Sequence, residues 1–502
     1  MKRYLLAHDL GTSGNKATLF TFDGQLVDSR VSAYPTDYSH DNWAEQDPRR
    51  WWTAVCETTR ALLRGRDPKE IAVVCFSGQM MGCLCVDARG EPLRHSIIYS
   101  DQRAEAQTRR LVDRLSPREV YRISGHRASP SYSIEKLMWV KDHEPDLYAR
   151  THKMLNAKDF MNFKLTGRMS TDHNDASGTN AFDISLREWS ARVLDAAEID
   201  PDKLPEAVES VKVVGEVTRG AAEETGLAAG TPVVAGAGDG GCATVGAGSV
   251  DVGITYNYLG SSSWISTTST TPVFDESERT FTWVHPVPGF YQPCGTMQTA
   301  GSAYSWLKEE ICGLETRDAE AAGVDPYERI NLEIEKSPPG ANGVMFLPYL
   351  LGERSPRWNP RAKGAWIGMR LETKRPDILR SVLEGVSFNL EIILSVMRRF
   401  VPIEEVTLIG GGAKGRLWRQ MLADVFGLPI HIPSYLEEAT SMGAAIIGGV
   451  GAGCFSDFAV AKRFVILQEE VLPQPVNVAT YNALKPIFDE CYSRLEPVFE
   501  KL

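Results

Sequence analysis

Two acidic residues stand at glycine-rich turns that follow apolar segments, and this combination suits phosphate chemistry. Asp9 is followed by the turn Leu10-Gly11-Thr12-Ser13-Gly14. Small residues let backbone N–H groups approach an anion closely, and hydroxyls donate further hydrogen bonds without adding bulk. A carboxylate repels phosphate unless a cation such as Mg²⁺ lies between them, so Asp9 is a candidate metal contact. The alternative is that Asp9 only caps a turn.

The second acidic residue, Asp239, lies among glycines and alanines in the segment Ala235 to Gly241. We expect this carboxylate at the exposed end of a buried strand, where few neighbours obstruct a bound substrate. There it could accept the proton of an attacking hydroxyl. An aspartate before a helix is also a common N-cap, which is the structural alternative.

The chain repeats one local layout about half its length apart. Residues 4–20 and 253–268 each read as strand, hydroxyl-rich turn and strand, and Gly260 lies 249 positions after Gly11. This spacing predicts two related lobes, residues 1–248 and 249–502, each opening with a hairpin whose turn can hold phosphate. Two unrelated hairpins are the alternative.

The remaining pattern is typical of an α/β protein. Short apolar strands are expected at residues 4–10, 71–77, 232–236, 343–347 and 406–410, and amphipathic helices at 101–115, 378–396 and 417–426. Gly410 to Gly415 follows one such strand and opens a helix, but no acidic residue closes a second strand about 20 positions later, as a dinucleotide fold requires. The loop suits a nucleotide held in another fold.

Composition excludes several classes of protein. The 502 residues carry a net charge of −11, which disfavours nucleic-acid binding, and 43% are hydrophobic, which excludes a disordered chain. The nine cysteines are scattered without metal-ligand spacing, so free thiols in a reducing compartment are expected. No signal-peptide core and no apolar run of about 18 residues occurs, so we expect a cytoplasmic protein without a membrane partner.

Two longer segments resemble the signatures of the FGGY carbohydrate kinases. They are Ser131 to His143 and Gly364 to Glu384. Within that family the chain is most similar to the xylulokinases, through Trp43 to Trp52 and Phe346 to Arg354. The resemblance implies two ribonuclease-H-like lobes of the actin and hexokinase type with a cleft between them, ATP mainly on the C-terminal lobe and sugar mainly on the N-terminal lobe.

The resemblance also assigns residues. The first phosphate motif falls on Asp9, Gly11, Thr12 and Ser13, with Lys16 just beyond, and the second on Gly260, Ser261, Ser262 and Ser263. The adenosine loop falls on Gly410, Gly411, Gly412 and Ala413. The catalytic base falls on Asp239, and the sugar contacts on Gln79, Met80, Met81, Asp101, Arg103 and Asp239 itself.

The implied activity is transfer of the γ-phosphate of ATP, with Mg²⁺, to a terminal hydroxyl of a pentulose, first of all D-xylulose to D-xylulose 5-phosphate. Met81 stands where xylulokinases usually have histidine, and Gly240 where they usually have asparagine, so the sugar is open. Ribulose, L-xylulose and erythritol are alternatives. A non-catalytic, nucleotide-gated actin-like protein is the rival from another class, and a homodimer is the expected assembly.

Overall fold

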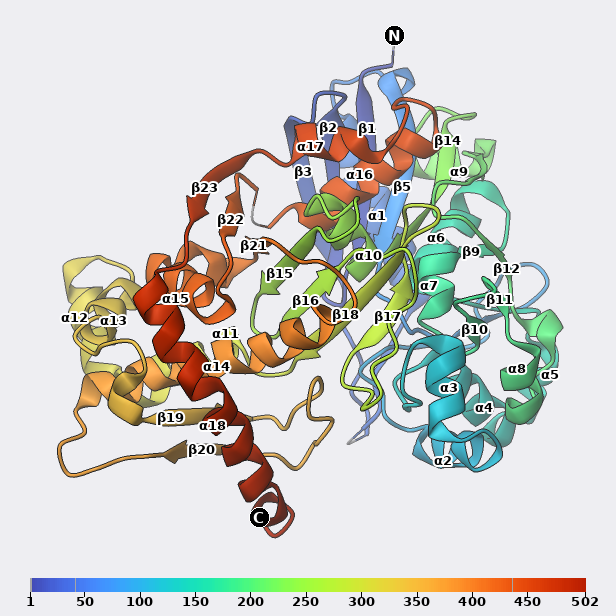
Figure 1. Cartoon of the computed structure of the whole chain (residues 1–502). Helices are drawn as coiled ribbons and strands as arrows, with labels where there is room; N and C mark the ends of the chain where they lie inside the picture. The colour runs from blue at the N-terminus through green and yellow to red at the C-terminus, as the bar shows by residue number, and fades with distance from the viewer. Residues whose placement is uncertain (1, 41, 436) are drawn as a thin grey trace.

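The computed structural model describes residues 2–40, 42–435 and 437–502, and two central β-sheets organise it (Figure 1). The first sheet contains, in spatial order, β13 (Val213–Glu216), β14 (Pro232–Gly238), β5 (Ile71–Gly78), β1 (Tyr4–Leu10), β2 (Gly14–Thr21) and β3 (Leu26–Ala33). The second contains β17 (Phe281–Val284), β18 (Tyr291–Met297), β16 (Ser263–Thr267), β15 (Thr255–Leu259), β21 (Val406–Ile409), β22 (Ile430–Pro433) and β23 (Leu467–Val471).

The two sheets share one topology. In each, three strands are antiparallel and two further strands join in parallel, so that β3-β2-β1-β5-β14 corresponds to β18-β16-β15-β21-β22. Each sheet also ends in an antiparallel edge strand, β13 or β23. This repetition confirms the two-lobed α/β fold and the predicted pair of hairpins.

Alternation of side chains gives each lobe its layers. In the first sheet, Leu6, Leu19 and Phe76 face helices α1 (Pro48–Leu63) and α6 (Ala157–Thr166), whereas Leu5 and Phe20 face α16 (Ala439–Gly451). Both faces are therefore covered. This explains why β1 and β5 read as continuous apolar runs.

Two helices lie between the lobes. Helix α10 (Asp239–Gly246) follows β14 and touches both sheets, with Cys242 and Val245 in the core of the first and Ala243 against Tyr256 and Ile409 of the second. Helix α16 leaves the second sheet and packs on the first. The two helices cross at Gly246 and Gly443, where an added Cβ would lie 1.8 Å from a carbonyl oxygen of the other helix. Only glycine permits this backbone contact, so the crossing joins the lobes tightly.

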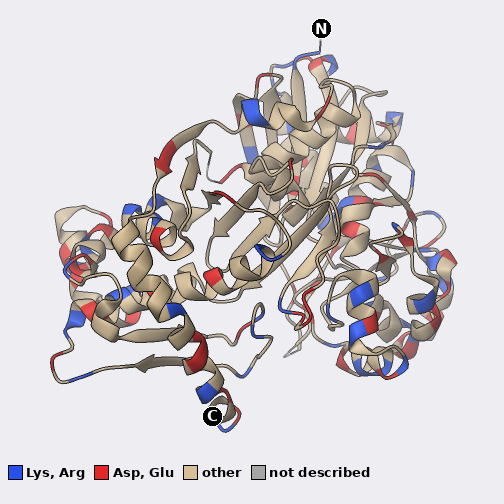
Figure 2. Ribbon diagram, in the orientation of Figure 1, with Lys and Arg blue, Asp and Glu red and all other residues tan. Residues whose placement is uncertain are grey.

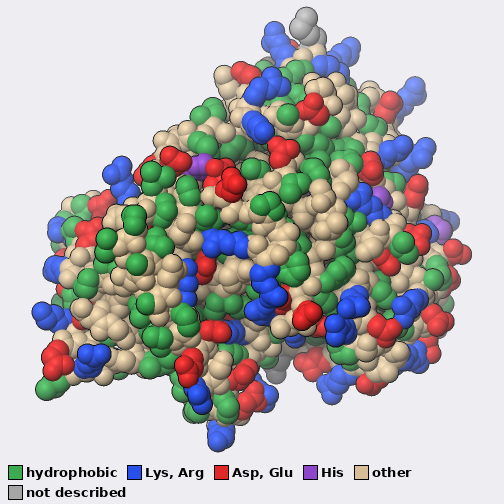
Figure 3. Space-filling view, in the orientation of Figure 1, with side chains coloured by type: hydrophobic (Ala, Val, Ile, Leu, Met, Phe, Trp, Pro, Cys, Tyr) green, Lys and Arg blue, Asp and Glu red, His purple; other side chains and the backbone are tan. Residues whose placement is uncertain are grey.

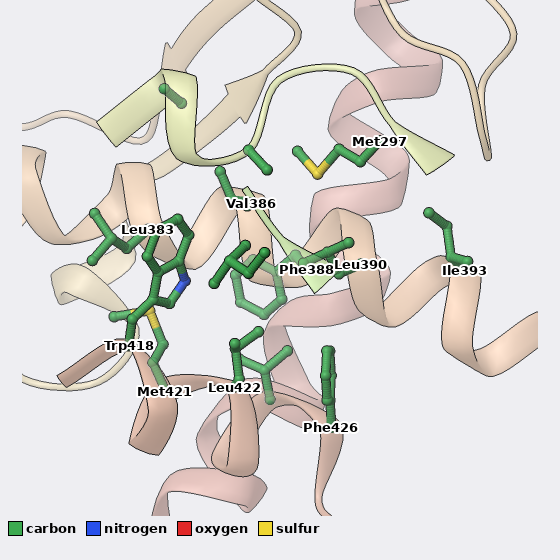
Figure 4. Close-up of a cluster of buried hydrophobic side chains, with 14 of the residues drawn as sticks. Met297, Leu383, Val386, Phe388, Leu390, Ile393, Trp418, Met421, Leu422 and Phe426 are labelled. Carbon is green, nitrogen blue, oxygen red and sulfur yellow. The ribbon is translucent and has the colours of Figure 1, made fainter. Parts of the chain in front are cut away.

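The second lobe has its own large core. Helix α14 (Arg375–Met397) packs Leu383, Val386 and Ile393 against α15 (Arg416–Phe426) and the second sheet (Figure 4). Trp418 and Phe426 of α15 close this cluster. Burying each such side chain stabilises the fold by about 1.5–3 kcal/mol.

Two groups of elements flank the sheets in Figure 1, and the first group is an insertion between β5 and β14. Helices α2 (Glu105–Arg114), α3 (Pro117–Ser124), α4 (Ser133–His143), α5 (Pro145–Arg150) and α8 (Ala191–Ala197) gather beside the first lobe, at the right of the view. Helices α12 (Gly313–Ala322) and α13 (Pro326–Ile334), strands β19 (Met345–Pro348) and β20 (Gly364–Ile367) and the last helix α18 (Pro475–Phe499) lie at the left.

Several elements differ from their predicted bounds, among them α2 and β19. Helix α2 begins at Glu105 rather than at residue 101, because the Asp101 carboxylate accepts hydrogen bonds from the backbone of Ala44 and Arg103 and holds a turn there. The strand expected at 343–347 is β19, Met345–Pro348, and it forms a two-stranded sheet with β20.

The surface mixes both signs of charge. Lys and Arg alternate with Asp and Glu along the outer helices (Figure 2) and over the face in Figure 3. No helix in the described ranges is long and apolar enough to cross a membrane. All nine cysteines are free, as expected from their spacing.

Candidate active site

The first phosphate turn joins β1 to β2 and is fixed through its carbonyl groups. The Tyr34 hydroxyl donates to the carbonyl of Gly11 (2.5 Å), and Gln46 Nε2 donates to the carbonyl of Thr12 (2.6 Å). Across the turn, the N–H of Gly11 donates to the carbonyl of Gly14 (3.0 Å). These bonds hold the backbone of the turn in one conformation, which a site that binds an anion through backbone N–H groups needs.

Asp9 lies at the base of this turn. Its carboxylate accepts a hydrogen bond from Ser77 Oγ (2.9 Å), and Lys16 is close enough to interact with its charge. Burial raises the pKa of Asp9, and Ser77 and Lys16 offset part of that rise. Lys16 Nζ also lies 3.3 Å from Glu438 Oε1, which precedes α16, so the first turn is connected to the second half of the chain.

The second phosphate turn joins β15 to β16 and is held from another direction. Ser302 donates to the carbonyl of Ser261 through both its N–H (3.0 Å) and its Oγ (2.9 Å), and Gly301 donates to the carbonyl of Gly260 (2.8 Å). The side chains of Ser261 and Ser262 are exposed. Ser263 is different, because its hydroxyl is buried and donates to the carbonyl of Tyr258 (2.6 Å).

The predicted adenosine loop packs against this second turn. An added Cβ at Gly410 would lie 2.7 Å from the carbonyl oxygen of Leu259, and one at Gly412 would lie 2.5 Å from the Leu259 side chain. Gly410 also has φ +90°, which a side chain disfavours. An added Cβ at Gly411 meets no atom within 4 Å, and Ala413 is buried. The loop is therefore shaped for close contact on one side and open on the other.

Asp239 is the first residue of α10, where the helix N-terminus follows β14. Its carboxylate is reached by solvent although protein surrounds it. Burial, and then the negative charge of Asp9, raise the pKa of Asp239 to about 7. This is the range in which a carboxylate is an effective general base near neutral pH. The effect of Asp9 on this pKa also means that the two acids predicted to act together lie near each other.

The strand before Asp239 is shaped by glycine. Gly236 has φ +76°, and an added Cβ would lie 2.0 Å from the carbonyl oxygen of Phe76. At Gly238 an added Cβ would overlap the Met80 side chain, at 2.4 Å. Both positions let β14 lie tightly beside β5 and Met80, which directs Asp239 to the end of the sheet.

Asn174 holds the same segment from behind. Its Oδ1 accepts from the N–H of Gly238 (3.1 Å), and its Nδ2 donates to the carbonyl of Val284 in the second lobe (2.7 Å). Asn174 is itself fixed by the Asp172 carboxylate, which accepts from its N–H (2.9 Å) and pairs with buried Lys158 (2.8 Å). Asp239 thus rests on a buried polar network, not on a loose loop.

The predicted sugar contacts form two groups. Gln79 and Met80 are buried beside the first turn, and the N–H of Gln79 donates to the carbonyl of Leu10 (2.9 Å). Met81 has φ +63°, and its carbonyl accepts from Lys136 Nζ (2.8 Å). Gln79 and Met80 therefore lie near the two acids, and Met81 follows them directly in the chain.

Asp101 and Arg103 form a buried ion pair. Arg103 donates to Asp101 through Nε (2.9 Å) and Nη2 (2.7 Å), and its guanidinium lies 3.7 Å from the centre of the Trp43 ring. Asp101 also accepts from the N–H of Ala44 (2.6 Å). The acceptor positions of Asp101 are thus occupied by protein groups.

Sequence reasoning missed the contribution of the second sheet. Buried residues from both lobes form one cluster beside Met80, namely Tyr132, Phe281, Trp283 and Cys294, with Trp264 packed against them. In β18, Gln292, Cys294 and Thr296 alternate with Pro293 and Gly295 and therefore share a face. The alternation of Gln292, Cys294 and Thr296 along β18 was the sequence signal that could have indicated this contribution.

The donor set suits a nucleotide with Mg²⁺. The turns at 11–13 and 260–262 offer N–H groups and hydroxyls, and Asp9 offers one carboxylate, as Mg²⁺ sites shared with phosphate oxygens typically do. In the described parts of the chain, no three or more His, Cys, Asp or Glu side chains gather into a protein-only metal site.

Comparison with known proteins agrees with this geometry. Models of the N-terminal and C-terminal domains of the FGGY family of carbohydrate kinases match residues 4–246 and 255–452. The xylulose kinase of Escherichia coli (strain K12) is 30% identical, over 98% of this chain and 99% of that protein. The gluconokinase of Bacillus subtilis (strain 168) is 28% identical, over 100% and 98%.

Solved structures give the same result. A xylulose kinase from Lactobacillus acidophilus superposes with a TM-score of 0.92 at 26% identity, and each chain is covered to 99%. A gluconate kinase from the same organism gives the same values. Both halves of the sequence and the whole fold therefore lead to one conclusion: the chain is a carbohydrate kinase of the FGGY family.

Proposed function

We propose that this kinase transfers the γ-phosphate of ATP to a terminal hydroxyl of a pentulose, first of all D-xylulose, to give D-xylulose 5-phosphate. The observation that carries the proposal is the position of Asp239 at the N-terminus of α10. Its carboxylate has a pKa of about 7 and lies close enough to Asp9 for the two negative charges to repel each other. Relatives named xylulose kinase that match nearly the full length support the choice of sugar.

In the proposed mechanism, Asp239 accepts the proton of the sugar hydroxyl while that oxygen attacks the γ-phosphorus and the bond to the β–γ bridging oxygen breaks. The N–H groups and hydroxyls of Thr12, Ser13, Ser261 and Ser262 would bind the phosphate oxygens. Asp9 would hold Mg²⁺, which neutralises phosphate charge when it is bound. Gly410 to Ala413 would receive the adenosine.

The pair Lys16 and Glu438 supports this arrangement. Lys16 follows the first turn, and Glu438 lies where the chain passes from the second sheet to α16 on the first, so their 3.3 Å contact holds this connection beside the first phosphate turn. In-line transfer needs the donor and the base to be held together, and positioning supplies most of the acceleration in such reactions.

A second candidate substrate is gluconate. Relatives named gluconokinase match as fully as the xylulose kinases do. Burial raises the pKa of both Tyr132 and Cys294, and the positive charge of Arg354 offsets part of that rise, so Arg354 lies near the cluster around Met80. A guanidinium there suits a substrate carboxylate.

The test is coupled ADP release across pentuloses, polyols and aldonates at saturating MgATP. We expect D-xylulose to give the highest kcat/KM, and Met81→His and Gly240→Asn to change the ranking of sugars. Activity on gluconate that is lost in Arg354→Met would favour the second candidate. ATP binding without sugar-dependent ADP release from any compound would instead indicate a non-catalytic, nucleotide-gated protein.

A further inference from the structure

Gln292 is a buried polar residue of the second lobe that lies beside the residue after Asp239. It is only 1% exposed, and its strand β18 pairs with β17, with Trp283 opposite. Its Nε2 donates to the carbonyl of Gly240 (3.2 Å). Because that carbonyl can only accept, the bond fixes which end of the carboxamide faces Gly240.

The other end of the carboxamide has no protein partner. Gln292 Oε1 is buried and accepts no hydrogen bond from a described residue. The same is true of Thr296 Oγ1, which lies on the same face of β18. Buried acceptors without a partner are rare in folded proteins, and they are found where a ligand or a water completes the bonding.

The space beside Gly240 adds an independent observation. An added Cβ at Gly240 would meet nothing closer than Gln292 Nε2, at 4.0 Å. Cys294, the next residue on this face, belongs to the buried cluster with Met80 and Tyr132. The missing side chain at 240 therefore leaves room that borders Gln292, Asp239 and the cluster around Met80.

We propose that Gln292 is a specificity-determining residue, whose Oε1 accepts a hydrogen bond from the sugar hydroxyl next to the one that is phosphorylated. This inference rests on the proposed sugar site around Asp239. Residue 240 is glycine in this chain and has no side chain to contact the sugar. Gln292 supplies the polar contact in its place. Because Gln292 and Asp239 belong to different lobes, a sugar bound to both joins the lobes.

The test compares Gln292→Met with wild type and with Gln107→Met as a matched control. Methionine keeps the length and flexibility of the side chain but removes both polar atoms. Gln107 is also buried with a free Oε1, but lies on α2 in the flanking insertion. Sugar affinity is measured by calorimetry, and sugar KM is measured by ADP release. Both measurements are repeated with an analogue of the sugar that lacks the hydroxyl next to the phosphorylated one.

We expect Gln292→Met to weaken binding of the parent sugar about 10-fold, the loss of one net hydrogen bond to the ligand, with an unchanged KM for ATP. The variant also loses the hydrogen bond from Nε2 to the Gly240 carbonyl, so a small fall in Tm is expected. The analogue should bind equally well to wild type and variant, because the contact is already absent. Gln107→Met should change neither affinity. If Gln292→Met does not fold, Gln292→Asn, which shortens the same group, is expected to show the same pattern.

Equal affinity of wild type and variant for the parent sugar overturns the proposal, because a water then satisfies Oε1. Equal weakening of parent and analogue also overturns it, because the effect is then not on that hydroxyl. Sugar binding without ADP release in wild type defeats the proposed function while the calorimetric comparison still decides the role of Gln292. Binding of no compound in the panel defeats both.

Discussion

The two hairpin turns of the molecule share a backbone plan and differ in charge. Gly11 and Gly260 occupy matching positions after β1 and β15. Two residues earlier, the first lobe has Asp9 and the second has Tyr258. Asp9 bonds to Ser77, whereas Tyr258 stacks on Trp264 with ring centres 4.0 Å apart.

This difference divides the proposed work between the lobes. The first lobe carries both acids, Asp9 and Asp239, and burial, followed by the negative charge of Asp9, raises the pKa of Asp239. The second turn offers uncharged donors on Ser261 and Ser262 beside the glycine loop at 410–413. Similar folds can therefore carry different chemistry, because function depends on the residues at the site.

The largest effect is expected from replacing Asp239, the proposed general base in the first lobe. Asp239→Asn should lower kcat about 10³-fold, because a carboxamide cannot accept the hydroxyl proton, while the Kd for ATP stays close to that of wild type. Single-turnover kinetics and nucleotide titration measure the two quantities. Near-normal turnover would show that Asp239 is not the base.

The acid and the tyrosine at matching positions are expected to behave differently. Asp9→Asn should lower kcat about 100-fold, whereas Tyr258→Phe should change it less than 3-fold.

In wild type, kcat/KM for MgATP should rise with pH through about 7, as Asp239 loses its proton. Asp9→Asn removes a neighbouring negative charge, so the pKa of Asp239 falls and this rise moves to lower pH. A rise at unchanged pH would mean that Asp9 does not influence the base.

The glycines that join the lobes should matter for stability more than an open glycine. Gly443→Ala sets a Cβ 1.8 Å from the Cys242 carbonyl oxygen, so we expect a loss of about 2 kcal/mol or more in the free energy of unfolding. Gly411→Ala, in open space, should cost less than about 0.5 kcal/mol. Chemical denaturation compares them. Equal free energies of unfolding for Gly443→Ala and Gly411→Ala would show that α10 and α16 can move apart at little cost.

The smallest effects are expected within the second turn. Ser261→Ala should raise the KM for ATP about 5-fold through one lost hydrogen bond, without a change in Tm. Ser263→Ala should do the opposite, lowering Tm with little change in KM, because its hydroxyl is already bonded to Tyr258. An unchanged KM in Ser261→Ala would argue against phosphate binding by that hydroxyl.

Much of the fold could be predicted because its signals are local. Apolar runs marked β1, β5 and β14 within two residues of their ends, and the repeated hairpin predicted two related lobes, whose sheets the structure shows to share one topology. The crossing of α10 and α16 could not be predicted. Glycines such as Gly246 and Gly443 are common inside sequences, and only the packing of two distant segments gives them a partner.

The sequence by itself determined the two lobes, the family and the residue types at the turns. These features depend on the spacing of apolar residues and on short motifs of glycine and hydroxyl residues, which can be read from consecutive positions. Only the tertiary structure decided which polar groups are free. It joined Asp101 to Arg103, buried the Ser263 hydroxyl, and brought Gln292 beside Gly240 from 52 positions away. Hydrogen bonding is a property of neighbours in space, and distant segments become neighbours only when the sheets and helices pack.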